Sequence, residues 1–428
     1  MLRLFGGLVL FVSTFYCGPR RRTGKGRRKE GAGIYPELSL LGFSEGISPA
    51  LASEIARQSA LLSSFDLARR EMERRGVPLD IKVVHRISIR LGQEILSVRK
   101  RDLLPWREGK LPSGKELAGK RIGVAIDGGR TRIREKVRRQ RGKGRNKKQR
   151  RGWEAQWREP KKFIIFEVDE KGRMKRGTRS FIDGTFQGPD ALMELLAMRL
   201  HQLGAAEAES ITFLGDGASW IWNRLDEVIR LAGLPKERVE KVLDFYHGTQ
   251  HIHLALLALG FFAPEERQRA FKRLRKQLKK GRVKEVIKEL KGYVQKKGVA
   301  EKALEREIKF LEKHAPHMAY DRIRAEGKPM GSGAIESVIR RVLNQRLKGN
   351  GIMWTKANAE AVMVLRGTIL SDRWEETLDH VRATMATDRK IDWKWSSPDM
   401  RQEKIPDETD WASVPQTLTK DRVKGIQP

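Results

Sequence analysis

Between residues 121 and 247 the sequence alternates between short apolar runs and helical segments, and this pattern restricts the possible folds more than any other feature. Helices are predicted at 189–203 and 219–232 because their apolar residues recur with helical spacing. The element order is therefore β-β-β-α-β-α-β, which predicts an α/β fold with a mixed sheet flanked by helices. The five runs with the length and composition of buried strands are RIGVAID (121–127), KFIIFEV (162–168), RSFID (179–183), ITFLGD (211–216) and KVLDFYH (241–247).

Three acidic residues occupy comparable places in this pattern. Asp127 ends the first strand and Asp216 the fourth, each beside glycines, and Glu336 lies just inside a helix that follows a Gly-Ser-Gly segment. The element order is that of the ribonuclease H fold, in which the first and fourth strands are parallel neighbours and an acid on the final helix completes the cluster. Each acid also has a simpler explanation: the aspartates as turn formers, and Glu336 as an ion-pair partner of Arg340.

Such a carboxylate cluster suits phosphodiester chemistry. Cleavage and strand transfer require an attacking oxygen to be activated and a leaving oxygen to be stabilised, and two Mg²⁺ ions about 4 Å apart do both. Carboxylate oxygens are the ligands that Mg²⁺ prefers. We therefore expect Asp127, Asp216 and Glu336 to be both catalytic residues and metal ligands, with Mn²⁺ as an alternative ion.

The charge of the chain indicates its partner. The formal net charge is +34 over 428 residues, and a polyanion is needed to offset that much self-repulsion. Nucleic acid is the expected partner, and a generic basic surface, as in ribosomal-type proteins, is the alternative. Hydrophobic residues make up 39% of the chain, which allows a sizeable core and argues against global disorder.

The apolar N-terminal run, with Arg3 in front of it, could be a signal peptide, but a buried strand or a misplaced start codon explains it better. The apolar run at 4–16 is too short to span a bilayer comfortably, and it leads into arginines without a small-residue cleavage pattern. Cys17 is the only cysteine, so one chain cannot form a disulfide or a cysteine-based zinc site. We expect a cytoplasmic, nucleoid-associated protein with no membrane partner.

Several basic segments are predicted to contact DNA. Ser48 followed by Pro49 predicts a helix start, and Asp80 is a plausible N-cap for a helix from residue 81 to about 96. A helix near 65–75, a turn and this second helix are compatible with a helix-turn-helix or with an ordinary helical hairpin. Residues 130–160 are an Arg/Lys-rich excursion, and 253–328 read as a basic helical insertion. Apolar positions of the insertion, such as Phe271, Leu274 and Leu278, can pack a small helical subdomain. The predicted DNA contacts are Lys82, Arg86, Arg90, Arg138, Arg139, Arg150, Arg151, Lys272, Arg273, Arg275, Lys276, Arg340, Arg341, Arg346, Lys348 and, by stacking on an unpaired base, Trp354.

Four segments resemble the ISKra-type family of bacterial insertion-sequence transposases. They are AIDGGR (125–130), FLGDGASWIWN (213–223), DFYHGTQHIH (244–253) and GSGAIESVIRRVLNQRLKGNGIMW (331–354). The resemblance covers roughly residues 36–385. It implies a DDE active site on Asp127, Asp216 and Glu336, and Mg²⁺-dependent cleavage and strand transfer of DNA at the element ends.

The resemblance also implies auxiliary residues and partners. DFYH looks like the D-x-x-H element of Mutator-like transposases, which points to Asp244 and His247 as auxiliary active-site residues. The implied partners are terminal inverted repeats, target DNA and further copies of the chain in a synaptic complex. His247 and His251 would share a helix face, so zinc binding, DNA contact and local hydrogen bonding are all open for this pair.

One departure from the family concerns the N-terminus. Family members begin with a longer region of Cys-x-x-Cys-type ligands, whereas only Cys17 occurs here. A non-catalytic nucleic-acid-binding protein or a decayed transposase is therefore the alternative function, and a nuclease without strand transfer is a third. The predicted organisation is a degenerate or truncated segment with a basic linker (1–35), a helical DNA-binding region (36–112), the first part of the ribonuclease H-like core (113–252), the helical insertion (253–328), the Glu336 helix with C-terminal helices (329–390) and a loose tail (391–428).

Overall fold

The computed structural model describes most of the chain between residues 46 and 388. Residues up to Ala386 belong to one compact unit. The predicted DNA contacts Arg138, Arg139, Arg150 and Arg151, the predicted tail and nearly all of the predicted segment 1–35 lie outside the described residues. The described ranges are 2–3, 9–10, 35, 37–38, 41–43, 46–137, 152–294, 296, 298–349 and 351–388.

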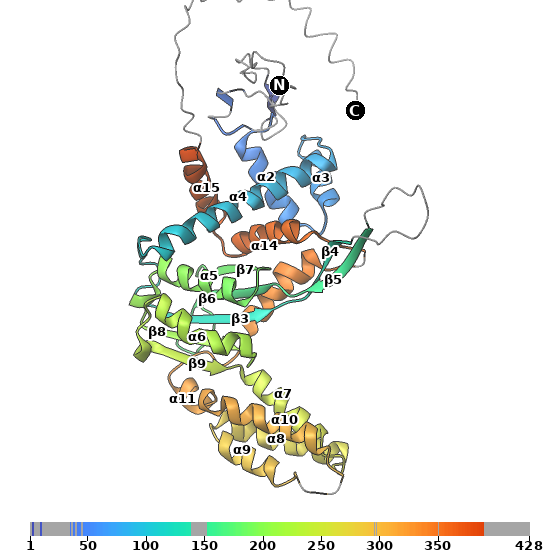
Figure 1. The fold of residues 1–428 in the computed structure, drawn as a ribbon, viewed down its shortest axis with the longest axis vertical. Coiled ribbons are helices and arrows are strands. Elements are labelled where there is room, and N and C mark those ends of the chain that lie inside the picture. Colours follow the sequence, from blue (N-terminus) through green and yellow to red (C-terminus); the bar gives the residue numbers. More distant parts are fainter. Residues whose placement is uncertain are drawn as a thin grey trace, which may run out of the picture. The chain divides into compact units, whose positions relative to one another are not determined.

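A five-stranded mixed sheet lies at the centre of this unit (Figure 1). Its strand order is β7-β6-β3-β8-β9. β6 pairs antiparallel with both β7 and β3, and β8 is parallel to both β3 and β9. The predicted α/β fold with a mixed sheet is confirmed. The strands are β3 (Arg121–Gly128), β6 (Lys161–Glu167), β7 (Phe181–Thr185), β8 (Ser210–Gly215) and β9 (Val239–Leu243).

Helices cover both faces of the sheet because successive side chains of a strand point to opposite faces. Ile122, Val124 and Ile126 of β3 pack in one core cluster with α5 (Pro189–Gln202) and α6 (Ser219–Leu231). Ala125 belongs to the other cluster, which includes residues of α7 (Phe245–Leu257), α12 (Gly333–Val338) and α14 (Lys356–Leu370).

Three N-terminal helices begin at side-chain caps, and two of these caps, Ser48 and Asp80, are predicted by the sequence. Ser48, Ser64 and Asp80 each accept a backbone N–H from the first turn of α2, α3 and α4 respectively. α4 extends well beyond the predicted end near residue 96. It packs on α14, where Gly92 has no room for a Cβ beside Ala361, and beyond residue 96 Arg99 hydrogen-bonds to Glu360 of α14. The helices are α2 (Pro49–Leu61), α3 (Phe65–Arg74) and α4 (Ile81–Arg107).

The helical insertion begins earlier than its sequence suggested. The strand predicted at 241–247 ends at Leu243, because Asp244 caps α7 and the chain turns into a helix at Phe245. Leu274 and Leu278 are buried as predicted, and Phe271 packs against them from a partly exposed position. The remaining helices of the insertion are α8 (Pro264–Lys279), α9 (Val283–Lys291), α10 (Glu301–His314) and α11 (Tyr320–Ala325), with a 3₁₀ turn at Ala315–His317.

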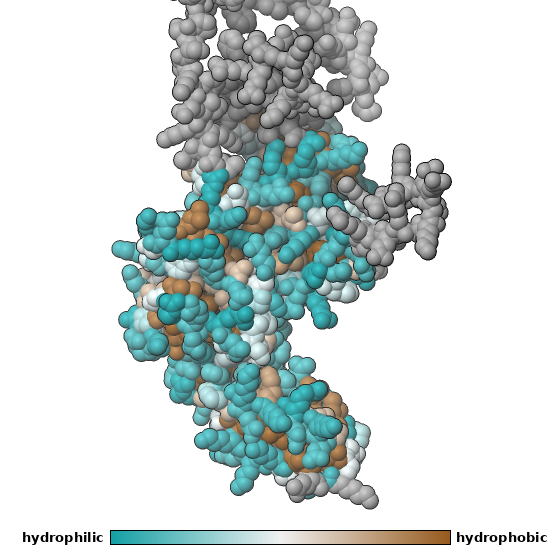
Figure 2. All heavy atoms as spheres, in the orientation of Figure 1, coloured by the Kyte–Doolittle hydropathy of each residue, from teal (hydrophilic) through white to brown (hydrophobic). Residues whose placement is uncertain are grey.

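The predicted Glu336 helix is present and consists of three segments. α12 continues through a π-helical turn into α13, and the predicted apolar residues Ile335, Val338 and Val342 are buried while Ile339 is partly buried. Figure 2 shows teal, hydrophilic residues over much of the visible face, with brown residues scattered among them. The remaining elements are the π turn (Ile339–Asn344), α13 (Gln345–Leu347), α15 (Trp374–Asp388), β1 (Leu2–Arg3), β2 (Val9–Leu10) and the 3₁₀ turns Ala205–Glu207 and Lys236–Arg238.

Two further strands were not predicted. The region 130–160, interpreted as a basic excursion, forms a two-stranded antiparallel ribbon from β4 (Thr131–Val137) and β5 (Gly152–Arg158). The ribbon extends beyond the five-stranded sheet from the ends of β3 and β6 (Figure 1). None of the helices in the described residues combines the length and apolar character needed to cross a bilayer.

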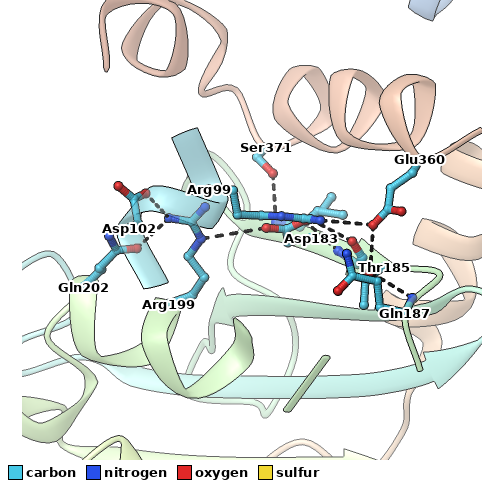
Figure 3. A network of polar contacts seen from close by, with 11 residues as sticks. Arg99, Asp102, Asp183, Thr185, Gln187, Arg199, Gln202, Glu360 and Ser371 are labelled. Atoms are coloured by element: carbon cyan, nitrogen blue, oxygen red, sulfur yellow. Dashed lines mark hydrogen bonds and ion pairs between the residues drawn. The ribbon is translucent and has the colours of Figure 1, made fainter. Parts of the chain in front are cut away.

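A buried ionic network joins the N-terminal helices to the sheet (Figure 3). The guanidinium of Arg99, on α4, donates hydrogen bonds to Asp183 of β7 at 2.7 Å and to Glu360 of α14 at 3.1 Å. The hydroxyl of Thr185 also donates to Glu360, at 2.7 Å. Lys162 is buried nearby, and burial lowers its pKa to about 7 despite the attraction of Asp183. The network fixes α4 and α14 on one edge of the sheet.

Replacing Arg99 is expected to destabilise the protein strongly. Arg99→Ala leaves two buried carboxylates without their shared cation, which we expect to lower the free energy of unfolding by about 3–5 kcal/mol. The exposed neighbour Lys100 serves as the control, and Lys100→Ala is expected to change it by less than about 0.5 kcal/mol. Urea unfolding followed by circular dichroism measures both, and equal effects would contradict a structural role for Arg99.

Candidate active site

Two of the predicted catalytic acids lie side by side at the ends of neighbouring strands. Ala125 of β3 stands opposite Leu214 of β8. Two residues further along, the same parallel alignment places Asp127 beside Asp216. Because side chains alternate along a strand, both carboxylates lie on the same face of the sheet as Ala125 and Leu214. Adjacent strands are about 4.8 Å apart, so the two aspartates can share a ligand.

The electrostatics of Asp127 reflect this arrangement. Burial raises the pKa of its carboxyl to about 6, and the charge of Asp216 acts in the same direction. The backbone N–H of Gly128 donates to Asp127 Oδ1 at 2.6 Å and opposes the shift. Asp216 Oδ1 accepts the backbone N–H of Ala218 at 2.9 Å, which holds the second carboxylate at the strand end. The charges of Asp127 and Asp216 repel each other, and a bound cation would relieve this repulsion.

A third aspartate follows the next parallel strand. The backbone N–H of Asp244 donates to the carbonyl of Gly215 at 2.9 Å and continues the pairing of β8 with β9. The Asp244 carboxylate is fully buried and accepts the backbone N–H groups of His247, at 2.8 Å, and of Ser332. Burial alone would raise the pKa of Asp244, but these hydrogen bonds and that of the His247 ring lower it below its ordinary value.

His247 is held toward the other two aspartates. Its Nδ1 lies 3.3 Å from Asp244 Oδ1. This hydrogen bond raises the pKa of His247, burial opposes the shift, and the charges of Asp216 and Asp127 add to the increase. The predicted auxiliary pair is thus brought together with the predicted catalytic aspartates, and the histidine is the nearby group that can carry a positive charge.

Glu336 lies on the helix that passes along these strand ends. Ser332, which bonds to Asp244, precedes it by about one turn, and Ile339, which packs at Gly129 beside Asp127, follows it by about one turn. The Glu336 side chain is exposed. In the part of the chain that the structure describes, no three His, Cys, Asp or Glu side chains group closely enough to hold a metal ion. Its role as a third ligand therefore stays a prediction.

Glu159 is a neighbour of Asp127 that the sequence did not identify. Its charge raises the pKa of Asp127 further, and its carboxylate forms an ion pair with Lys161. The Glu159 carboxylate lies directly against Gly128, the residue after Asp127. The one signal in the sequence was Gly128, because a glycine allows another group to approach closely. It does not show which residue that group belongs to.

The other histidines of the segment after Asp244 make separate local contacts. His251 hydrogen-bonds to the buried Glu307 at 2.5 Å and stacks on Phe310. His253 meets the edge of Phe271. Among the alternatives open for His247 and His251, local hydrogen bonding is the one observed.

Most of the described predicted DNA contacts are exposed. Arg273 is exposed but is engaged by Glu289 through two hydrogen bonds of 2.5 Å. Arg90 is half-buried and lies 3.8 Å from Glu94. Arg341 and Lys348 are also half-buried. The fully exposed ones are Lys82, Arg86, Lys272, Arg275, Lys276 and Arg340.

Burial contradicts two of the predicted DNA contacts. Arg346 is 2% exposed, donates to the carbonyls of Ser59 at 3.0 Å and Ser63 at 3.2 Å, and covers the rings of Phe65 and Trp354. Trp354 is 7% exposed, so its ring is not available to stack on a base. Together they attach the N-terminal helices to the chain after the Glu336 helix, a structural role.

Comparison of the chain with known proteins found no matching family model, no matching curated protein and no matching solved structure.

The raised pKa of Asp127 predicts a pH-dependent gain in stability when its charge is removed. A carboxyl group whose pKa is about 6 when folded and near 3.8 when unfolded costs stability progressively as the pH rises from about 4 to 6. Asp127→Asn is therefore expected to raise the free energy of unfolding of the metal-free protein by about 1–2 kcal/mol at pH 8, after discounting for solvent screening.

Urea unfolding in EDTA at pH 4 and pH 8 measures this difference. Asp226, an exposed aspartate at the surface of α6, provides the matched control, and Asp226→Asn should show no comparable gain at pH 8. An equal gain for Asp127→Asn at both pH values would contradict the buried, charged state of this carboxylate.

Proposed function

We propose that this protein is a DDE-type DNA transposase that cleaves and joins DNA at the ends of a mobile element. The observation that carries the proposal is the side-by-side placement of Asp127 and Asp216 on adjacent parallel strands, where their charges repel. A pair of carboxylates in this state suits a hard divalent cation. The sequence resemblance to the ISKra-type transposases implies the same residues.

A ribonuclease H-like core is part of this proposal. In chain order the core strands are β3, β6, β7, β8 and β9, so the first and fourth are parallel neighbours at the centre and the second and third continue antiparallel on one side. This is the arrangement that the sequence pattern predicts for such a core. The helical insertion between β9 and the Glu336 helix, and the N-terminal helices before β3, are additions to it.

The residues at the strand ends would divide the chemistry among them. Asp127 and Asp216 would hold Mg²⁺, or Mn²⁺, which when bound activates the attacking oxygen and stabilises the leaving oxygen. Asp244 orients the His247 ring through the contact at Nδ1. A protonated His247 beside the two aspartates can donate a hydrogen bond to a phosphate oxygen of the DNA. Glu336 would approach from the helix one turn away.

The insertion is placed to align DNA at this site. Gly217, the residue after Asp216, lies against Phe310 of α10 so closely that a Cβ there would clash. The insertion therefore flanks the second catalytic aspartate directly. Its helix α8 exposes Lys272, Arg275 and Lys276 to solvent, and cations of this kind contact phosphate groups without regard to sequence.

Removing either catalytic carboxylate should separate cleavage from binding. Asp127→Asn and Asp216→Asn are expected to abolish Mg²⁺-dependent cleavage of DNA fragments that carry the terminal sequences flanking the gene. Affinity should stay equal or rise slightly, because a negative charge near phosphate is lost. Gel assays of cleavage and joining, with fluorescence anisotropy for binding, measure the two properties, and Asp226→Asn is the control. Cleavage by both variants would refute the proposed active site, and binding without cleavage by the wild-type protein would favour the non-catalytic alternative.

Neutralising the exposed cations of α8 should affect cleavage more than binding. The triple variant Lys272→Ala/Arg275→Ala/Lys276→Ala is expected to slow cleavage by roughly tenfold or more, because misplacing the scissile phosphate by about 1 Å costs rate heavily. Affinity at moderate salt should fall by less than about threefold, since many other cations remain. Arg273→Ala is the matched control because Glu289 already engages that side chain. Equal losses of rate and affinity would show that α8 only binds.

A further inference from the structure

The two faces of the β4–β5 ribbon differ in their surroundings. The ribbon keeps the residue pairing of β3 with β6 across the break at Gly129, whose N–H donates to the carbonyl of Pro160 at 3.0 Å. On one face, Ile133 is fully buried and forms a bridge with Trp354, and the Thr131 hydroxyl donates to the carbonyl of Leu347 at 3.1 Å. That face is anchored on the chain after the Glu336 helix, so the other face is turned away from the anchor.

The outward face combines cations with indole rings. Its described β4 residues are paired with β5 residues of the same face, and none of the six carries a carboxylate. Trp153 is 40% exposed and Trp157 is 57% exposed, and neither belongs to a core cluster of the described residues. The six residues, in facing pairs, are Arg132 with Trp157, Arg134 with Ala155 and Lys136 with Trp153.

Each indole lies against a cation. The guanidinium carbon of Arg132 is 5.2 Å from the ring centre of Trp157, and that of Arg134 is 4.3 Å from the ring centre of Trp153. Lys136 Nζ lies 5.8 Å from the ring centre of Trp153. These contacts hold the cations beside the rings without neutralising them. Large indoles that remain exposed among charges contribute little to folding and are typical of binding surfaces.

We propose that this outward face binds single-stranded DNA, with unpaired bases stacked on Trp153 and Trp157 and phosphate groups paired with Arg132, Arg134 and Lys136. The inference rests on the proposed function only for the choice of DNA as the ligand. Aromatic rings interleaved with cations are the combination that binds single strands, because every base has a π-face and every nucleotide a phosphate. Both properties are present on this one face.

The spacing favours a single strand over a duplex. Trp153 and Trp157 are four residues apart on one strand, so their rings lie about 14 Å apart and receive different nucleotides. Bases in a duplex are already stacked and present only their edges, whereas an unpaired base can turn its face onto an indole. An acidic protein segment would pair with the cations but gain nothing comparable from the two rings.

The ribbon lies close in the chain to the proposed active site. Asp127 lies five residues before Arg132 on the same hairpin. Lys161, at the start of β6, repeats the cation-over-indole arrangement with Trp220, at 4.2 Å, close in sequence to Asp216. The ribbon therefore begins a few residues along the chain from the strand end that carries Asp127.

Binding measurements on the full-length protein in EDTA test this inference apart from catalysis. The probes are a fluorescently labelled oligo-dT of about 20 nucleotides and a labelled duplex of equal length. Trp153→Ala/Trp157→Ala is expected to weaken oligo-dT binding roughly 10- to 100-fold and duplex binding by less than about threefold, because each stacked base contributes appreciably to affinity. Trp153→Phe/Trp157→Phe should bind oligo-dT within about threefold of the wild type.

The control lies on the same strand but on the opposite face. Gln156→Ala should leave both affinities unchanged. Thermal unfolding of each variant checks that the fold is intact. If the Ala variant is unstable, Trp153→Leu/Trp157→Leu, which keeps apolar side chains but no rings, replaces it and should lose oligo-dT binding in the same way. Three outcomes would overturn the inference. The Ala variant could lose affinity for oligo-dT and duplex equally, or it could bind oligo-dT as the wild type does. The wild-type protein could also bind a polyglutamate peptide as tightly as it binds oligo-dT.

Failure of this inference and failure of the proposed function are distinguishable. If oligo-dT binding does not depend on Trp153 and Trp157 while Mg²⁺-dependent cleavage is intact, only the proposal of single-strand binding on the ribbon is refuted. Tight, tryptophan-dependent oligo-dT binding without any cleavage would support the platform and refute the transposase. Asp226→Asn should bind oligo-dT like the wild type in EDTA, because that aspartate lies exposed on α6.

Discussion

Parallel pairing of β3 with β8, and of β8 with β9, determines where the acidic side chains of this protein meet. Each strand ends within about one residue of an aspartate, so the alignment brings Asp127, Asp216 and Asp244 to one edge on one face. Carboxylates in such a row repel one another, and the protein responds differently at each. Asp244 is stabilised as an anion by hydrogen bonds, whereas Asp127 is left with a raised pKa. A bound cation would stabilise the charged form of Asp127 against this repulsion.

Some of the basic residues of this chain have structural roles inside the fold. Arg99 is shared between two buried carboxylates. Arg346 and Arg366 donate instead to backbone carbonyls of the helical region at 59–63, and burial lowers the pKa of each to about 10. Such residues attach α2, α4 and α14 to one another. The net charge still indicates a polyanionic partner, but the number of basic residues overstates the number available to it.

The sequence was informative where a local pattern decides the outcome. Apolar runs of five to seven residues defined the core strands, and cap residues such as Ser48 and Asp80 defined helix starts, because both depend on neighbouring residues alone. It failed at 241–247, where Asp244 fits equally well as a strand residue and as the helix cap that it is. The burial of Arg346 and Trp354 depends on Phe65, nearly three hundred residues earlier, and no local pattern carries that information.

The sequence also failed to predict the β4–β5 ribbon, and this omission matters more for the proposed function. Its strands carry charges on one face and few apolar residues on the other, so neither alternation nor an apolar run identified them. Yet the break between the ribbon and the sheet is tightly packed, because Gly129 lies against the buried Leu343 without room for a side chain. Packing of this kind fixes the direction in which the ribbon leaves Asp127. If nucleotides bind on the ribbon as proposed, their binding energy can therefore be used to hold the scissile phosphate in place, since a rigid connection transmits position and a flexible one does not.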